Sequence, residues 1–540
     1  MPARTRPGDA VVFHENPPLR LSIVPAATGR ADAIVIPLFS DQRADAIDLG
    51  GVPAEQRRLI LSTLALGDFK GKEGETYAMG TGPLAGEVEI RRIFLVGLGK
   101  RESLDADVVR WAGARACQYA RKRELSRVLI HPGSLAKLNW SDFAADFAEG
   151  AILGGFAFKD YQSTSDESDR GDDQNNRPTS AQPKPVKMMR FELIGPADDQ
   201  SLREKVSRRS AIAQAANYAR FIACQPGNVV TPAVMVDLAR KLARQCGLKI
   251  TVLDARAARR LGMGGLCAVG RGSMHPPSLI LLEYAPPKTG RGAGRQKTVA
   301  VVGKAVTFDT GGISIKPAAD MGAMKYDKCG GAAVLGIMRA ATTLPLNQRL
   351  IGVIPVVENA VDARSCRPGD IVRMYNGKTV EISNTDAEGR LILADALAYT
   401  CEKFHPDALI DMATLTGGVV VALGGVYAGL MGNDDQLAAD LIAAGQQTGE
   451  WLWRLPLHER YKKLLESPHA DIQNSGAREA HPIQGGMFLR EFLPTGTAWA
   501  HLDIAGVAHP KKEHRYWIAD TANGFGVRLV TQYLLGNLPK

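Results

Sequence analysis

The sequence contains few cysteines and places none of them in a CxxC pair. Its seven cysteines are odd in number and scattered along the chain, which argues against both a disulfide framework and a cysteine-rich zinc site. The first thirty residues mix Arg, Asp, Glu and Pro without a continuous apolar core. We therefore expect no secretory signal and a reducing, cytoplasmic location.

Two common hydrolase motifs are also missing. None of the ten histidines forms an HExxH motif, which excludes the helix-borne design of single-zinc peptidases. No GxSxG segment is present either, so the chain has no nucleophile elbow of the serine hydrolase type. Chemistry based on these two motifs is therefore not expected.

Met412–Asn433 is a long run without charge. A bilayer span takes about 20 predominantly apolar residues, so the length of this run is sufficient. Its six glycines, however, make it a poor isolated helix, and Ala408–Leu415 fits a buried strand. We therefore predict buried core and glycine-rich loops here, and no association with a membrane.

At 540 residues, with 45% hydrophobic and 23% charged residues, the chain is long enough for two globular domains. Short apolar runs alternate with helix-like stretches, which predicts the α/β class. We expect a smaller N-terminal α/β domain over residues 1–200 and a larger C-terminal α/β/α domain over residues 201–540, with a mixed, largely parallel sheet. Strands are predicted at 33–39, 90–97, 127–131, 249–253, 278–284, 298–302, 350–357, 378–382, 408–415 and 499–504, and helices at 104–123, 142–158, 204–223, 233–245, 331–341, 391–402 and 525–535.

Residues 162–187 differ sharply in composition from their surroundings. They are dense in Ser, Asp, Asn, Gln and Pro and contain almost no apolar residue. Such a segment cannot bury enough apolar surface to offset the entropy of ordering it, so we predict a disordered insertion. It separates two strand-like runs, Phe156–Phe158 and Met188–Ile194.

The net charge of +9 indicates a possible attraction to anions or nucleic acid. Basic clusters occur at residues 121–123, 203–209 and 288–297, but acidic residues or glycines interrupt them and aromatic residues do not alternate with them. A solvated surface is therefore the better interpretation. A DNA-binding or architectural role stays open as an alternative function.

The octet Asn384–Leu391 holds the first candidate site residues. Asp386 and Glu388 are two residues apart, so in an extended segment both carboxylates project from the same side. Like charges held together repel each other unless a cation or a proton lies between them. Arg390 adds donors suited to an anion. The simpler alternative is a turn in which Asp386 caps the next helix.

A second candidate segment follows the predicted strand at 298–302. Lys304 and Asp309 lie near the end of this strand, where buried charges need partners. Carboxylates are suitable ligands for Zn²⁺ or Mn²⁺, particularly in a two-metal site, whereas a lysine can bind a metal only when it is neutral. For any single residue an ion pair or a cap is the simpler explanation. The combined set of candidate metal ligands is Lys304, Asp309, Asp327, Asp386 and Glu388.

Together these segments closely resemble the leucyl aminopeptidases of the cytosolic type, a family of metallopeptidases. Order and spacing agree over roughly residues 200–540, and the first 200 residues agree in outline. The matching segments are 303–316, 324–330, 358–359, 367–370, 384–391, 413–417 and 499–506.

The resemblance implies two divalent ions per subunit, Zn²⁺ or Mn²⁺. Asp309 and Glu388 would bridge both ions; Asp386 would complete one site, and Lys304 with Asp327 the other. A hydroxide bridging the ions would attack the peptide carbonyl. The catalytic residues would be Lys316, facing that carbonyl, and Arg390, holding a bicarbonate that acts as general base.

The resemblance also implies an aminopeptidase that releases N-terminal residues, Leu and similar ones preferred, from peptides. The free α-amino group would bind a metal and Asp327, so only chain ends would be cut. The family forms hexamers, and some bacterial members bind DNA. Lys328 departs from the family pattern and places an extra cation next to Asp327. The substrate cleft would be lined by Met324, Thr414, Leu415 and Gly417.

Overall fold

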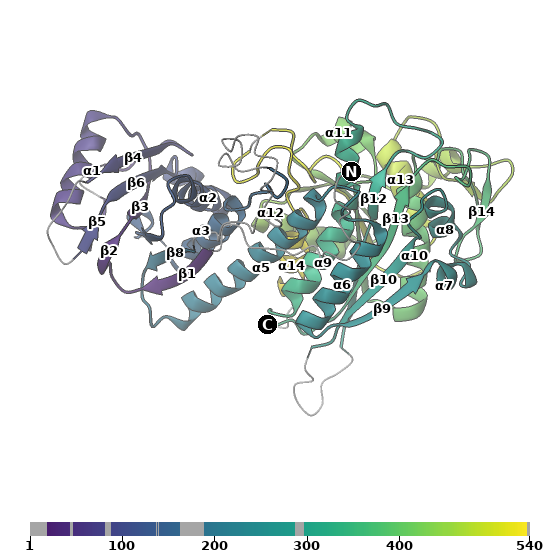
Figure 1. The fold of residues 1–540 in the computed structure, drawn as a ribbon, viewed down its shortest axis with the longest axis horizontal. Coiled ribbons are helices and arrows are strands. Elements are labelled where there is room, and N and C mark those ends of the chain that lie inside the picture. Colours follow the sequence, from purple (N-terminus) through teal and green to yellow (C-terminus); the bar gives the residue numbers. More distant parts are fainter. Residues whose placement is uncertain are drawn as a thin grey trace, which may run out of the picture. The chain divides into compact units, whose positions relative to one another are not determined.

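The structure is a computed structural model that describes residues 19–536, apart from 44–46, 82–87, 137, 139, 163–187, 287–295 and 513. It divides into two compact units, an N-terminal unit within His14–Ser210 and a C-terminal unit that contains Ala211–Lys540. The division falls within helix α5 (Gln200–Cys224). Each unit contains its own sheet and helices, which confirms the predicted two-domain α/β class (Figure 1).

The N-terminal unit is built on a six-stranded sheet with the order β1-β8-β7-β3-β6-β4. All neighbouring strands in it are parallel except β4, which runs antiparallel to β6. A separate pair, β2 and β5, is also parallel. The strands are β1 (Leu19–Val24), β2 (Gly29–Ala31), β3 (Ala33–Leu38), β4 (Thr76–Gly80), β5 (Val88–Ile90), β6 (Arg92–Gly97), β7 (Arg127–Ile130) and β8 (Met189–Ile194).

Helices cover both faces of this sheet. Helices α2 (Ala106–Lys122) and α3 (Trp140–Gly154) pack on one face, and α1 (Ala54–Leu66) packs on the other. The α2 helix begins where the side chain of Asp105 accepts a hydrogen bond from the backbone N–H of Val108, at 2.8 Å. It ends in basic residues, which complement the helix dipole.

The strand predictions for β3, β6, β7 and β8 are confirmed to within a few residues. The strand-like reading of Phe156–Phe158 is wrong, because these residues form an irregular segment after α3. Phe156 and Ala157 are buried there, and three apolar residues are too few to distinguish a strand from a buried loop. The predicted disordered insertion at 162–187 lies, apart from Gln162, outside the described residues.

The C-terminal unit is built on a nine-stranded sheet with the order β18-β17-β20-β16-β11-β13-β10-β9, in which β12 also pairs with β13. The central strands β13, β11, β16 and β20 are parallel, and antiparallel pairs occur only toward the edges, which confirms the mixed, largely parallel sheet. The strands are β9 (Lys249–Asp254), β10 (Ser278–Tyr284), β11 (Thr298–Gly303), β12 (Ala305–Asp309), β13 (Arg349–Asn359), β16 (Ala408–Ala413), β17 (Ala428–Gly432), β18 (Leu452–Arg454) and β20 (Trp499–Asp503).

Two groups of helices enclose this sheet (Figure 1). A small sheet of β14 (Ile371–Arg373), β15 (Thr379–Glu381) and β19 (Ile472–Gln473) lies beside it. One helix group is α7 (Ala255–Arg260), α8 (Gly264–Gly270), α10 (Glu388–Phe404) and α13 (His481–Arg490); the other is α6 (Pro232–Cys246), α9 (Cys329–Ala341), α12 (Asp435–Thr448) and α14 (Val527–Gly536). The short helix α11 (Gly417–Leu423) packs against α13.

The carboxyl ends of the central strands bring the candidate residues together. Strands β11 and β16 are parallel neighbours, and the backbone N–H of Lys304, just past β11, donates to the carbonyl of Met412 at 3.0 Å. Strands β12 and β13 end at Asp309 and Asn359, which are register partners. In a parallel sheet, loops that leave neighbouring strands at this edge form a natural site.

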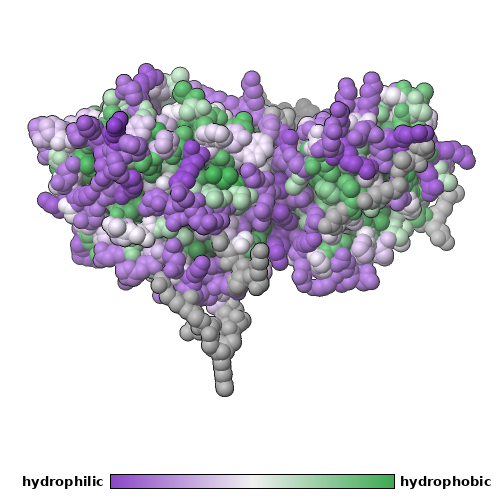
Figure 2. All heavy atoms as spheres, turned by 180° about the vertical axis from the view of Figure 1, so that it is seen from behind, coloured by the Kyte–Doolittle hydropathy of each residue, from purple (hydrophilic) through white to green (hydrophobic). Residues whose placement is uncertain are grey.

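The uncharged run Met412–Asn433 forms the end of strand β16, helix α11 and strand β17. Strand β16 is buried along its whole length, as predicted. Across the part of the chain that the structure describes, no helix is both long and apolar enough to cross a bilayer. Hydrophilic and hydrophobic residues are mixed over the face shown in Figure 2.

Glycine at position 150 allows α2 and α3 to pack in close contact. A methyl group at this position would lie 1.8 Å from the carbonyl oxygen of Arg110 on α2. Gly150→Ala should therefore force the helices apart and lower the free energy of unfolding by about 3 kcal/mol, which exceeds the roughly 1 kcal/mol that alanine gains in helix propensity.

Urea unfolding of the full chain measures this effect. Gly80→Ala in β4 is the matched control, because its methyl group would meet no atom within 4 Å. The control should change stability by less than about 0.5 kcal/mol. Equal urea midpoints for the two variants would show that the close contact contributes nothing.

Candidate metal centre

Lys304 is a buried lysine whose ammonium group faces two carboxylates. Its Nζ lies 2.8 Å from Oε1 of Glu388 and 2.9 Å from Oδ2 of Asp327, and it donates to the carbonyl oxygen of Thr414 at 2.9 Å. Burial lowers the pKa of Lys304, but Asp327, Glu388 and Asp309 outweigh burial and raise the pKa above its ordinary value. The surrounding carboxylates therefore favour the charged form of the lysine.

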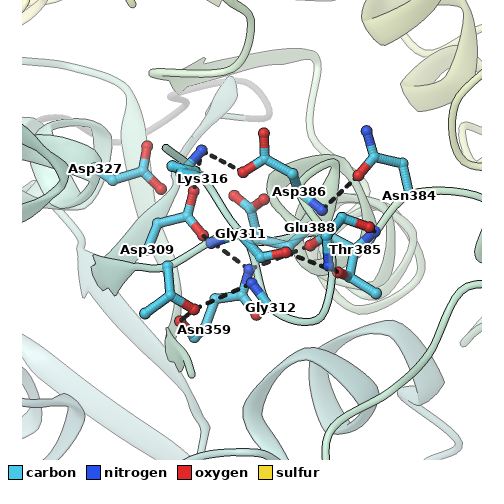
Figure 3. Close-up of polar contacts among 12 residues, drawn as sticks. Asp309, Gly311, Gly312, Lys316, Asp327, Asn359, Asn384, Thr385, Asp386 and Glu388 are labelled. Atoms are coloured by element: carbon cyan, nitrogen blue, oxygen red, sulfur yellow. Dashed lines mark hydrogen bonds and ion pairs between the residues drawn. The ribbon is translucent and has the colours of Figure 1, made fainter. Parts of the chain in front are cut away.

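The ammonium group of Lys316 faces a second pair of carboxylates, Asp309 and Asp386 (Figure 3). Its Nζ lies 2.8 Å from Oδ2 of Asp309 and also contacts Oδ1 of Asp386. Burial opposes the charge on Lys316, but the attraction of Asp309, Glu388 and Asp386 raises its pKa overall. Two ammonium groups thus lie among four carboxylates.

Asp309, Asp386 and Glu388 converge most closely. One ligand atom from each lies within 4.8 Å of the other two. Burial is the main cause of the raised pKa of Glu388, and repulsion from Asp309 raises the pKa further. The Oε2 atom of Glu388 is buried without a hydrogen-bond partner. A buried, unpartnered carboxylate oxygen between two other carboxylates is a suitable ligand for a cation.

The backbone around the octet is not extended, as the sequence interpretation of Asp386 and Glu388 assumed. Asp386 lies in a turn and Glu388 is the first residue of α10, so the two do not share an extended segment. The alternative role of Asp386 as a helix cap is wrong too, because Ala387 occupies the N-cap and no side chain caps α10. The carboxylates meet because the turn and the first helical turn face the same point.

Neighbouring groups hold two of the four carboxylates, Asp309 and Asp327, in place. Oδ1 of Asp309 accepts hydrogen bonds from the backbone N–H of Gly311, at 2.9 Å, and from Nδ2 of Asn359, at 2.8 Å. Gly311 has φ +86°, a conformation that favours glycine. Oδ1 of Asp327 accepts from the hydroxyl of Thr414 at 2.6 Å. These contacts leave the opposite oxygens, Oδ2 of Asp309 and Oδ2 of Asp327, facing the lysines.

Arg390 is buried on α10, close to the carboxylates. Its Nη1 donates to the carbonyl oxygen of Asn474 at 2.8 Å, and its Nε has no hydrogen-bond partner. Burial lowers the pKa of Arg390, and Glu388 and Asp503 partly offset this effect. A buried guanidinium with a free N–H group can bind a small anion.

The donor set fits divalent cations. Four carboxylates against two ammonium groups leave an excess of negative charge in a buried site, and oxygen ligands of this kind suit Zn²⁺ or Mn²⁺. Lys304 could act as a ligand only after losing a proton, and a divalent ion beside it would favour that loss. The residues present are therefore compatible with a metal centre.

Comparison with known proteins identifies the family. Residues 217–531 match the cytosol aminopeptidase family, catalytic domain, and residues 35–165 match its N-terminal domain. The chain belongs to the cytosol aminopeptidase family. It is a hydrolase of the metallo-aminopeptidase class.

Similar proteins cover almost the whole chain. A probable cytosol aminopeptidase of Persephonella marina is 38% identical over 470 residues, 86% of this chain and 89% of the relative. One of Chlorobium luteolum is 40% identical over 480 residues, 88% and 92% of the two chains. Among solved structures, a tomato leucine aminopeptidase variant has TM-score 0.81 and 28% identity, over 97% of this chain and 98% of that chain.

The bottromycin maturation enzyme BotP in complex with Mn is another similar structure. It has TM-score 0.79 and 32% identity, and the match covers 94% of this chain and 99% of that chain. The family is metal-dependent, and the carboxylates that converge in this chain are consistent with that dependence.

The structure brings Thr414 into the candidate centre, through its contacts with Lys304 and Asp327. Leu415 and Gly417 follow in the same loop, and Gly417 begins α11. Met324 is half-buried in the 3-10 helix η4 (Met321–Lys328), three residues before Asp327. As substrate-binding residues these four stay predictions.

Lys328 is buried, and its ammonium group faces backbone carbonyls. Its Nζ donates to the carbonyl oxygens of Gln225, at 2.7 Å, and Lys325. Burial lowers its pKa to about 8. The extra cation expected next to Asp327 is therefore held by backbone carbonyls.

Sequence reasoning missed the groups that position the candidate ligands. Asn359 bonds to Asp309 and also donates to the carbonyl oxygen of Thr385 at 3.2 Å. The carbonyl oxygen of Asn474 accepts a hydrogen bond from Arg390, and the side chain of Asp503 accepts one from the backbone N–H of Leu415. Asn359 and Asp503 end the strands β13 and β20, so a polar residue at the end of a predicted buried strand was the available signal.

Asn359→Ala should weaken the hold on Asp309. The variant loses two buried hydrogen bonds, which lowers the free energy of unfolding by about 1–3 kcal/mol. It should also lower Mn²⁺ affinity about 10-fold, as removal of a group that orients a metal ligand typically does. Calorimetric titration with Mn²⁺ and urea unfolding measure the two effects.

Asn433→Ala is the matched control. Asn433 also makes two hydrogen bonds, to the carbonyl of Thr497 and from the backbone N–H of Trp499, and neither partner is a candidate ligand. Because Asn433 is exposed, the control should lose less stability than Asn359→Ala, and it should keep its Mn²⁺ affinity. Unchanged affinity in Asn359→Ala as well would contradict the positioning role of Asn359.

Proposed function

We propose that this protein is a two-metal aminopeptidase that removes N-terminal residues, Leu and similar ones preferred, from peptides. The observation that carries the proposal is the convergence of Asp309, Asp386 and Glu388 within 4.8 Å, together with the unpartnered oxygen of Glu388. Membership of the cytosol aminopeptidase family supports the same activity.

Two divalent ions, Zn²⁺ or Mn²⁺, would be held by the five predicted ligands. Asp309 and Glu388 would bridge the ions, Asp386 would complete one site, and Lys304 with Asp327 would complete the other. When bound, such ions lower the pKa of water toward 7 and polarise the carbonyl of the peptide bond that is cut. The spatial grouping supports this assignment, because Lys304 contacts Asp327 and Lys316 contacts Asp386.

Lys316 and Arg390 would provide the remaining chemistry. The ammonium group of Lys316 is the less buried of the two lysines and would donate to the oxyanion that develops on the carbonyl. A donor of this kind contributes about 3 kcal/mol to transition-state stabilisation. Arg390 would hold a bicarbonate with its free N–H group, and a bicarbonate held there would supply a general base for the reaction.

The same residues account for cleavage at chain ends only. Asp327 would bind the free α-amino group of the substrate, which an internal peptide bond lacks. Met324, Leu415 and Gly417, with Thr414, would form the pocket for the first side chain. A pocket of this apolar kind distinguishes side chains that differ by one methylene by only about 1–3 kcal/mol, so neighbouring apolar residues should also be accepted.

Assembly and location follow from the family expectation. We propose a homohexamer in the cytoplasm, and light scattering that gives a monomer mass would contradict the hexamer.

The alternative DNA-binding role depends on the net charge of +9. In the cluster at 203–209, Lys205 pairs with Asp142 and Arg209 lies 3.6 Å from Glu149, so part of this charge is already neutralised.

Hydrolysis of leucine-p-nitroanilide tests the proposed function. Activity should require added Zn²⁺ or Mn²⁺, disappear with a chelator, and fall to background in Asp386→Ala and Glu388→Ala, because each variant removes a metal ligand. Asp370→Ala is the matched control: its carboxylate pairs with Arg271 and Arg367 and touches no candidate ligand, so its activity should persist. Chelator-insensitive activity in either ligand variant would refute the proposal.

A further inference from the structure

Asp503 is a carboxylate without solvent exposure at the end of strand β20. Its Oδ1 accepts from the backbone N–H groups of Leu415, at 3.1 Å, and Thr416, at 3.4 Å. Its Oδ2 accepts from the hydroxyl of Thr416 at 2.6 Å. Three donors of the loop that follows β16 therefore converge on this one side chain.

One of these bonds fixes a peptide plane that also faces the metal centre. The N–H of Leu415 and the carbonyl of Thr414 belong to the same planar, trans peptide unit, so they point in opposite directions. The N–H points at Asp503, and the carbonyl oxygen accepts from Nζ of Lys304 at 2.9 Å. Rotation of this plane away from Asp503 would remove the acceptor of Lys304.

Thr414 also reaches Asp327. Its hydroxyl donates to Oδ1 of Asp327 at 2.6 Å, so a single residue orients two of the predicted ligands. Asp309 is held by different elements, through Gly311 and Asn359. The bonds that Asp503 accepts from Leu415 and Thr416 therefore lead, through Thr414, to only one of the two predicted metal positions, and its remaining donor is the nearby backbone N–H of Ala505, at 3.3 Å.

We propose that Asp503 is a positioning residue for the metal position formed by Lys304 and Asp327, acting through the Thr414–Leu415 peptide plane. This inference depends on the proposed function. A carboxylate suits the task because both of its oxygens can accept, and the loop offers it three donors. An asparagine would keep one accepting oxygen and lose the other, so Asp503→Asn should retain part of the effect.

Calorimetric titration of the metal-stripped full chain with Mn²⁺ tests the proposal. In Asp503→Ala one of two binding steps should weaken by about 10–100-fold, while the other stays within about two-fold of the unaltered protein. In Asp503→Asn the affinity of the weakened step should lie between that of Asp503→Ala and that of the unaltered protein. A purely structural role would loosen both steps together, which would overturn the proposal.

Asp411→Asn is the matched control for loss of a buried carboxylate. Asp411 is also fully buried, on the neighbouring strand β16, and it contacts His501 and Trp499 rather than the loop. This variant should lower the melting temperature without changing either Mn²⁺ step. A selective effect on one step in Asp411→Asn as well would contradict a specific role for Asp503.

Thr416→Val provides a second route if Asp503→Ala does not fold. It removes one donor to Asp503 and leaves the carboxylate in place. The same single step should weaken, by a smaller factor than in the alanine variant, and unchanged affinities would overturn the proposal. Absence of Mn²⁺ binding in the unaltered protein would instead refute the proposed function, so the two failures are distinguishable.

Discussion

The repulsion between four carboxylates in a buried site is the constraint on which the C-terminal unit depends. Asp309, Asp386 and Glu388 crowd within 4.8 Å, and Asp327 joins them through Lys304. Burial alone makes each charge costly, and mutual repulsion adds to that cost. The lysines at 304 and 316 neutralise part of this charge, and divalent ions would neutralise more.

The fold meets this constraint by spreading the ligands over independent supports. The four candidate carboxylates come from the end of β12, the 3-10 helix η4, a turn and the start of α10, and two of them, Asp309 and Asp327, have hydrogen-bond partners outside the ligand set. The strands that carry these residues are rigid, because the central strands of the sheet are parallel and buried on both faces. Rigid supports let like charges stay together that would otherwise separate.

Much of this arrangement could be predicted from the sequence. The apolar runs of the sequence predict buried strands such as β11 and β16. The octet at 384–391 and the segment at 303–316 contain most of the candidate site residues. Local patterns could not show that Asp386 lies in a turn and Glu388 in a helix, because two residues are too few for a periodicity. Nor could they show that Asn359 and Asp503 bind partners 50 and 88 residues away, since such contacts depend on strand order.

The most direct test of this account is anomalous X-ray diffraction from crystals grown with Mn²⁺. The account predicts two adjacent anomalous peaks, both contacted by Asp309 and Glu388, with Asp386 on one side and Lys304 and Asp327 on the other. A single peak, or peaks that none of these five side chains contacts, would contradict it.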